Sequence, residues 1–306
     1  MGNVENVENV ENVENVENVE KLFLEELKRE QLFPLFEEVF GITIQTLNDF
    51  SERGYWDDTY KALSILHDDK AIANVAAFSL PLLVNGERIN AAGIQSVMTH
   101  PNFRRQGLMT QLMSKMIEEI DKKCECTLLF TEIPELYASF GFKVVQEYLI
   151  TIPYDKKNNN DSLLRKLDYY MEEDRKLIHE TIDSSQRLSN NFSTLNFRPS
   201  FYLNMYDSEW NEKLYYSEKL DALIVYEVDN EKLKLYGVFA PVLPVLDEIC
   251  GEIAERFTEI EFYFSPDQLG IEDVQFTELQ SSKCLMVRSN KELDFKGFKF
   301  PVLTEF

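Results

Sequence analysis

The stretch Val97-Met98-Thr99-His100-Pro101-Asn102-Phe103-Arg104-Arg105-Gln106-Gly107-Leu108-Met109-Thr110 joins an apolar segment to a helix. The apolar segment, Ile94 to Thr99, predicts a strand that stops just before a proline. After the turn, apolar residues recur at helical spacing and predict one buried helix face; they are Leu108, Met109, Leu112, Met113, Met116, Ile117 and Ile120. A strand that passes into a helix in this way aims unpaired backbone N–H groups outward, where the helix dipole adds positive potential. The stretch therefore predicts a phosphate or pyrophosphate site, in which Gly107 lets the backbone approach the anion and Arg104 and Arg105 add charge.

A second informative segment lies one helix further along the chain. Residues Thr127 to Thr131 predict a buried strand, and Glu132 to Phe142 (EIPELYASFGF) predict a short helix. Pro134 suits the first turn of a helix, and Gly141 suits its end. Each segment alone also fits a plainer structure, namely an ordinary strand–turn–helix with surface arginines, or a half-buried structural tyrosine at position 137.

Taken together and in this order, the two segments resemble the GNAT acetyltransferases. Arg104-x-x-Gly107-x-Met109 matches their Arg/Gln-x-x-Gly-x-Gly/Ala signature except at the last position, where Met109 replaces a small residue. Tyr137 with Gly141-Phe142 reproduces the spacing of their Tyr-x-x-x-Gly-Phe segment. The tandem arginines and the Gly-Leu-Met ending are similar to the Eis-like (enhanced intracellular survival) branch. The resemblance implies an α+β fold, with a mixed and mostly antiparallel sheet flanked by helices.

The same resemblance implies acetyl-CoA as co-substrate and assigns residues to its binding. Backbone N–H groups from Arg105 to Thr110 would hold the pyrophosphate, and the strand edge Val97–Thr99 would pair with the pantetheine arm. The Tyr137 hydroxyl would protonate the departing CoA thiolate. The expected cofactor-binding residues are Val97, Met98, Thr99, Arg104, Arg105, Gln106, Gly107, Leu108, Met109 and Thr110.

The last seven residues, FPVLTEF at 300–306, form an apolar tail. Eis-like enzymes thread their C-terminus back into the first domain, where the terminal carboxylate serves as the base. The resemblance therefore implies that the Phe306 carboxylate is the catalytic base, with Glu132 as its substitute and with Glu305 and Glu132 beside the substrate. A tail that docks on the second domain for packing alone is the alternative.

The chain divides into three predicted parts. Residues 3–20 are six copies of Asn-Val-Glu, so 1–20 are expected to form a low-complexity tail. Residues 21–152 are expected to form the catalytic GNAT domain, followed by a polar boundary segment. Residues 153–306 echo that domain, with strands at 222–228, 232–239, 260–264 and 284–288 and a helix at 245–257. Prolines at 241 and 244 stand where the phosphate turn should be, so we expect a degenerate GNAT-like domain without a second cofactor site, and a tail that returns to the active site.

Composition limits the partners and the compartment. The net charge is −23, from 31 basic and 54 acidic residues, which argues against nucleic acid because phosphate contact needs a basic face. The same charge is compatible with a cationic substrate and equally with solubility alone. No segment is apolar enough for a membrane span. Four cysteines without a CxxC pair and three scattered histidines predict free thiols, no metal and a cytoplasmic setting. Assembly into a homo-oligomer is left open.

These observations favour an acetyl-CoA-dependent N-acetyltransferase that acts by direct attack of a primary amine. The expected acceptor is a small cationic amine, aminoglycoside- or polyamine-like. Two alternatives stay open at this point. One is a non-catalytic acyl-CoA-binding regulator, which would bind acetyl-CoA without turnover. The other is a protein acetyltransferase acting on lysines or N-termini.

Overall fold

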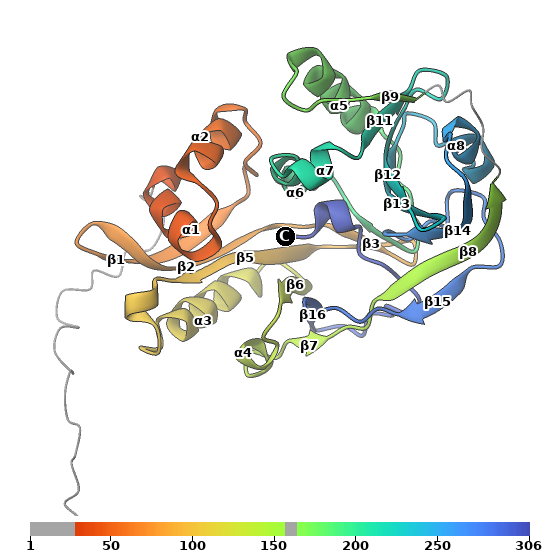
Figure 1. The fold of residues 1–306 in the computed structure, drawn as a ribbon. Helices are drawn as coiled ribbons and strands as arrows, with labels where there is room; N and C mark the ends of the chain where they lie inside the picture. The colour runs from red at the N-terminus through yellow and green to blue at the C-terminus, as the bar shows by residue number, and fades with distance from the viewer. Residues whose placement is uncertain (1–27, 157–163) are drawn as a thin grey trace, which may run out of the picture.

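The computed structural model describes residues 28–156 and 164–306. The Asn-Val-Glu tract expected as a tail at 1–20 lies outside the described residues. The described chain is a mixed α/β structure built on two large sheets and one small sheet (Figure 1). No helix in these two ranges is both long and apolar enough to cross a membrane.

The first large sheet has the order β1-β2-β5-β6-β16-β7 in the described residues. Its neighbours are antiparallel except for β5 and β6, which run parallel. The strands are β1 (Lys61–His67), β2 (Lys70–Ser79), β5 (Ala91–Thr99), β6 (Cys126–Thr131), β7 (Lys143–Val144) and β16 (Cys284–Ser289). Strand β2 is buried on both faces along almost its whole length, and β5 is buried on both faces at residues 91–94, because helices cover both sides of the sheet.

Helices occupy both faces of this first sheet (Figure 1). On one face, α1 and α2 pack through Leu35, Phe36 and Leu47 against strand residues such as Ala76. On the other face, α3 buries Leu112, Met113 and Met116 in a separate cluster. The helical segments of this half are η1 (Arg29–Leu32), α1 (Phe33–Phe40), α2 (Ile44–Glu52), η2 (Pro101–Phe103), α3 (Leu108–Ile120) and α4 (Glu135–Ala138). The helix predicted after Gly107 therefore forms where the apolar spacing placed it.

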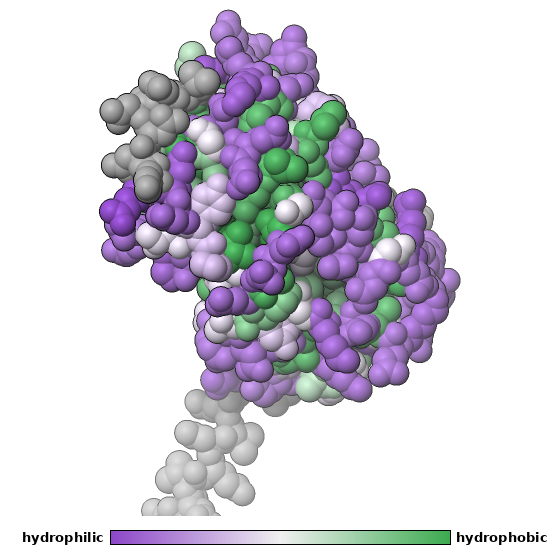
Figure 2. All heavy atoms as spheres, turned by 90° about the vertical axis from the view of Figure 1, so that its right-hand side faces the viewer, coloured by the Kyte–Doolittle hydropathy of each residue, from purple (hydrophilic) through white to green (hydrophobic). Residues whose placement is uncertain are grey.

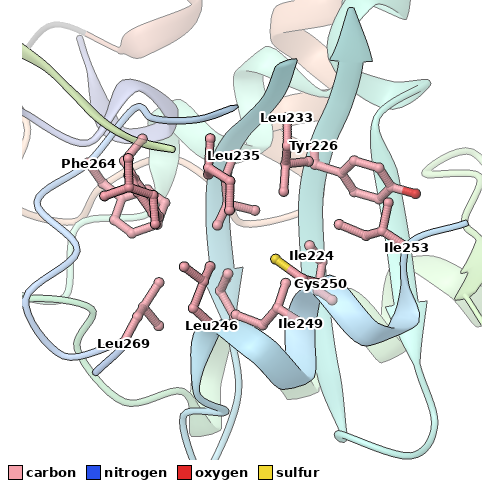
Figure 3. Close-up of a cluster of buried hydrophobic side chains, with 14 of the residues drawn as sticks. Ile224, Tyr226, Leu233, Leu235, Leu246, Ile249, Cys250, Ile253, Phe264 and Leu269 are labelled. Carbon is pink, nitrogen blue, oxygen red and sulfur yellow. The ribbon is translucent and has the colours of Figure 1, made fainter. Parts of the chain in front are cut away.

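The second large sheet has the order β15-β8-β14-β13-β12-β11-β9. Helix α8 lies on it and buries Leu246, Ile249 and Cys250 against Ile224 and Leu235 of the central strands (Figure 3). The strands are β8 (Tyr148–Lys156), β9 (Leu164–Lys166), β11 (Leu214–Ser217), β12 (Ala222–Asp229), β13 (Lys232–Phe239), β14 (Phe257–Phe262) and β15 (Gln275–Glu278), and α8 is Leu246–Glu252. The outer face on the side of β8 is mostly hydrophilic with hydrophobic residues between (Figure 2), in keeping with the acidic composition.

A small sheet and three helices connect the two halves. The sheet has the order β10-β3-β4, so β10 of the later chain pairs with β3 of the earlier chain. Its strands are β3 (Leu82–Val84), β4 (Glu87–Ile89) and β10 (Phe192–Thr194). The helices are α5 (Glu172–Ser184), α6 (Pro199–Asn204) and α7 (Ser208–Asn211), and a final turn, η3 (Val302–Thr304), precedes the C-terminus.

The two large sheets exchange strands. The strand at 284–288 was expected in the second half, but β16 lies in the first sheet and pairs with β6 from Cys284↔Thr131 to Ser289↔Cys126. Conversely β8 begins inside the range 21–152 expected for the first domain, but it pairs with β14 and β15 in the second sheet. Both assignments are wrong because apolar periodicity identifies a buried strand without naming its partner. The division of the chain at 152–153 stays a prediction about folding units.

Candidate active site

Strands β5 and β6 separate part-way along their length. They pair only from Ala91↔Cys126 to Gly93↔Leu128, and beyond that point their facing edges carry no ladder. A bulge bends β5 there: Ser96 has φ 53°, and the register against β2 shifts between Asn74 and Ala76. The resulting gap leaves the β5 edge at 94–99 open to another extended chain.

A buried asparagine holds this bulge. The Asn74 side chain is fully buried, its Nδ2 donates to the Ser96 carbonyl at 2.7 Å, and its Oδ1 accepts from the Ser64 hydroxyl at 2.7 Å. An amide in an apolar strand must be hydrogen-bonded to be tolerated. The Asn74 amide group binds the Ser96 carbonyl, which the bulge removes from the backbone hydrogen bonds between β2 and β5. The gap is thus a fixed feature of the sheet.

A cavity of about 490 Å³ occupies the gap. Its floor is formed by residues 94–97 of β5 and 129–131 of β6, and its far wall by α1, α2, α6 and the C-terminal tail. The structure brings Tyr137 and Phe306 together at this cavity, with Val97 and Glu305. Glu132, expected beside the substrate, is exposed and is not among the residues that line the cavity.

The turn before α3 presents the predicted row of backbone donors. Gly107 has φ 74°, and a Cβ built on it would meet no atom within 4 Å, so the space beside it is open. Arg105 is also left-handed, with φ 65°. Within the described residues, the N–H groups of 105–110 donate to no carbonyl, and the first helical bond is Gln111 N to Gly107 O at 3.1 Å. Such a row suits a pyrophosphate.

The side chains of the predicted cofactor residues divide into two groups. Arg104, Arg105, Gln106 and Thr110 are exposed around the turn, and Arg104 Nε donates to the Thr99 carbonyl at 3.1 Å. In contrast, Met98 and Leu108 are buried and Met109 and Thr99 are half-buried. Met109 packs against the cluster beneath α3. The methionine that departs from the signature is therefore accommodated as a core residue.

Tyr137 lies on α4 with 7% of its surface exposed. Its ring contacts Phe142 edge-on, with ring centres 6.3 Å apart. Burial raises the pKa of Tyr137, and a hydrogen bond with Thr131 lowers it in part. The phenol is therefore protonated at neutral pH and can act as a proton donor at the cavity.

The tail brings the last residue into the first half of the molecule (Figure 1). The Phe306 ring lies edge-on against Phe78, with centres 4.9 Å apart, and against Phe130 at 5.6 Å. Gly93 makes room for this contact, because a Cβ there would lie 2.3 Å from Phe78 and 3.0 Å from Phe306. No ion pair or hydrogen bond within the described chain engages the Phe306 carboxylate. The tail thus reaches the cavity instead of docking on the second sheet alone.

Ion pairs with two lysines hold Glu305, the residue before Phe306. Glu305 Oε1 lies 3.1 Å from Lys299 Nζ, and its other oxygen lies 3.8 Å from Lys283 Nζ. Lys299 is 3% exposed and also pairs with Glu147 at 2.7 Å. Burial raises the pKa of Glu147, whereas the adjacent Lys299 lowers it. Removing either partner would leave a buried charge, so this cluster anchors the tail.

Comparison with known proteins identifies the first half. Residues 23–145 match the family model described as an acetyltransferase (GNAT) domain. The chain carries a GNAT acetyltransferase domain. This domain makes the protein an acetyltransferase enzyme. The sequence has no match among curated proteins.

Solved structures show the same architecture over both halves. A conserved protein of unknown function from Enterococcus faecalis V583, titled a probable N-acyltransferase, has a TM-score of 0.55 and 14% identity, over 89% of this chain and 71% of that one. Eis1 from Mycobacterium abscessus has a TM-score of 0.53 and 14% identity, over 89% of this chain and 73% of that one. At this identity the likeness concerns the fold, which is GNAT-like and Eis-like along most of the chain.

The second half also contains a parallel pair of strands, as the GNAT domain does, but there the C-terminal tail occupies the gap beyond the paired residues. Strands β13 and β14 pair only from Lys232↔Glu259 to Leu235↔Phe262. Beyond that point the tail enters, with Val302 N donating to the Tyr263 carbonyl at 3.0 Å. Leu303 is buried and sits against Gly237, where a Cβ would lie 2.8 Å from it. The segment before α8 lacks a glycine turn, so this half offers no equivalent of the GNAT domain's phosphate turn.

Two features of the GNAT domain's cavity were not predicted. The gap depends on Asn74, whose only signal is a polar residue inside the apolar run AIANVAAF at 71–78. The aromatic wall comes from Phe36, Phe40, Phe50 and Trp56 of the first helices and the loop after them, whose apolar spacing indicated helix cores. Nothing in the spacing shows that these rings line a cavity.

Proposed function

We propose that this enzyme transfers an acetyl group from acetyl-CoA to a primary amine by direct attack. The observation that carries the proposal is the cavity itself, because it lies in the gap between β5 and β6 and joins Tyr137 to the end of the tail. The phosphate turn stands at the end of the same strand, β5. Strand β5 therefore ends at the candidate anion site and also lines the cavity in which Tyr137, the candidate proton donor, lies.

The residues around the gap fit acetyl-CoA. The unpaired N–H groups of 105–110 and the open space at Gly107 would hold the pyrophosphate, with Arg104 and Arg105 adding charge. The open edge of β5 at Val97–Thr99 would pair with the pantetheine amides. Acetyl-CoA would supply an activated acetyl thioester to the acceptor amine in the cavity.

The chain's own groups would move the two protons. An alkylammonium has a pKa of about 10, so a base must remove a proton before the amine can attack. We assign this role to the Phe306 carboxylate, since Glu305 is paired with lysines, Asp57 is hydrogen-bonded to Thr59 and Glu132 lies outside the cavity. The Tyr137 hydroxyl would then give its proton to the leaving thiolate, and the proton that the nitrogen loses on becoming an amide would restore the phenol. The proton taken by the carboxylate would pass to solvent.

The 306-residue chain incubated with acetyl-CoA and a panel of primary amines is expected to release free CoA in an amine-dependent manner. Thiol release measures the rate, and mass spectrometry of the amine shows a gain of one acetyl group. Calorimetry is expected to give one acetyl-CoA site per chain. Binding without release of CoA for any amine would instead identify a non-catalytic regulator, and acetylation confined to protein substrates would identify a protein acetyltransferase.

Gly107→Val is expected to weaken acetyl-CoA binding by about 10-fold or more. A β-branched residue at φ 74° is strained, and its side chain would fill the space that the anion needs. Gly86→Val is the matched control, because Gly86 has φ 80°, equally open surroundings and no place in the cavity. Calorimetric titration of both variants measures the effect. Unchanged affinity in Gly107→Val, with its fold intact, would move the phosphate site elsewhere.

A further inference from the structure

The acceptor side of the cavity is built largely from aromatic rings. Phe36, Phe40 and Phe50 come from α1 and α2, and Trp56 follows them in the next loop. Trp56 meets Phe50 edge-on with ring centres 5.7 Å apart and Phe36 edge-on at 6.0 Å. These contacts hold the rings as one wall opposite β5 and β6. A wall of this kind favours an apolar ligand body.

Among the described residues, two side-chain carboxylates line this cavity, and both are hydrogen-bonded or ion-paired. Asp57 Oδ1 accepts from the Thr59 backbone N–H at 2.7 Å and from the Thr59 hydroxyl. Glu305 is held by Lys299 and Lys283. Lys283 also lines the cavity, and its Nζ lies 4.8 Å from the centre of the Phe130 ring. Lys283 and Glu305 are thus paired with each other, so the lining that the structure describes offers an ammonium group only the carboxylates of Asp57 and Phe306.

We infer that the acceptor is a primary amine with a single positive charge on an apolar alkyl or aryl body. This inference rests on the proposed function and narrows it. A polyamine or aminoglycoside would bring several ammonium groups into a mostly apolar lining that has too few carboxylates to pair with them. Buried charges without partners are strongly disfavoured. A single ammonium needs only the one carboxylate assigned to remove its proton, while its apolar body covers the aromatic wall. The inference departs from the polyamine- or aminoglycoside-like acceptor expected from the sequence.

Phe40 offers a means to test the wall without harming the fold. Its side chain is 49% exposed although it lines the cavity, and it meets Phe36 with ring centres 6.0 Å apart. A half-exposed residue contributes little to the core, so its removal changes the binding surface more than the stability. Phe276 on β15 is 48% exposed and lies outside the cavity, so it provides a matched control.

The first experiment compares kcat/KM for 2-phenylethylamine and hexylamine with kcat/KM for spermidine and kanamycin, using the full chain and saturating acetyl-CoA. We expect the two apolar amines to exceed the two polycations by about 100-fold or more. Equal or higher values for spermidine or kanamycin would overturn this inference and leave the proposed function intact. No turnover with any of the four amines, despite acetyl-CoA binding, would overturn the proposed function and this inference with it.

The second experiment measures the same constants for Phe40→Ala and Phe276→Ala. Phe40→Ala is expected to lower kcat/KM for 2-phenylethylamine by about 10-fold and to leave acetyl-CoA affinity unchanged. Phe276→Ala is expected to match the wild type. Equal kcat/KM for 2-phenylethylamine in both variants would contradict an aromatic wall that contacts the acceptor.

Discussion

Tyr137→Phe is expected to lower kcat by about 100-fold or more and to leave acetyl-CoA affinity nearly unchanged. The ring keeps its contact with Phe142, so the variant loses only the hydroxyl. A group that protonates the leaving thiolate acts in the transition state and contributes little to ground-state binding. Steady-state rates and calorimetric titration separate the two quantities.

Tyr215→Phe provides the control for the loss of a phenol hydroxyl. Tyr215 lies on β11 in the second sheet, is half-buried and does not line the cavity. Its variant is expected to keep the wild-type kcat. A folded Tyr137→Phe enzyme that turns over at the wild-type rate would make Tyr137 a packing residue and would require another acid, or none.

Local signals in the sequence predicted the elements around the site well. The strand, turn and helix at 94–120 form as expected because apolar spacing, Pro101 and Gly107 act over a few residues. The short helix with Tyr137 follows from equally local preferences at Pro134 and Gly141. The family model over residues 23–145 confirms the GNAT interpretation built on these segments.

The pairing of strands that lie far apart in the sequence could not be predicted from these local signals. Strand β16 carries the apolar run expected of a buried strand, yet it joins β6 across more than 150 residues of chain. Arg288 secures that exchange, with Nη2 2.8 Å from Asp121 and Nε 3.0 Å from the Phe140 carbonyl. Neither contact can be recognised in the sequence. The apolar pattern of a strand shows that it is buried but does not show which strand it pairs with. The roles assigned to Tyr137 and Phe306 stay predictions, although both residues line one cavity.

Extending the chain by one glycine after Phe306 is expected to abolish turnover while acetyl-CoA binding persists. The extension retains the Phe306 ring among Phe78, Phe130, Phe197 and Phe300, so the aromatic packing can persist. It converts the Phe306 carboxylate into an amide and moves the charge by about 3.5 Å. Loss of the base leaves the acceptor amine protonated, and a protonated amine has no lone pair for attack.

Phe306→Leu is the complementary variant, because it retains the carboxylate and alters the ring. If the tail serves packing alone, Phe306→Leu should lower stability and the glycine extension should keep the kcat of the folded fraction. If the carboxylate is the base, the order reverses: Phe306→Leu keeps much of its activity and the extension loses it. Thermal unfolding and steady-state rates on both variants separate these outcomes. Full activity in the extended enzyme would remove Phe306 from the chemistry. Since Glu132 lies outside the cavity and Glu305 is paired with lysines, Asp57 would then be the remaining carboxylate in the lining to test as the base.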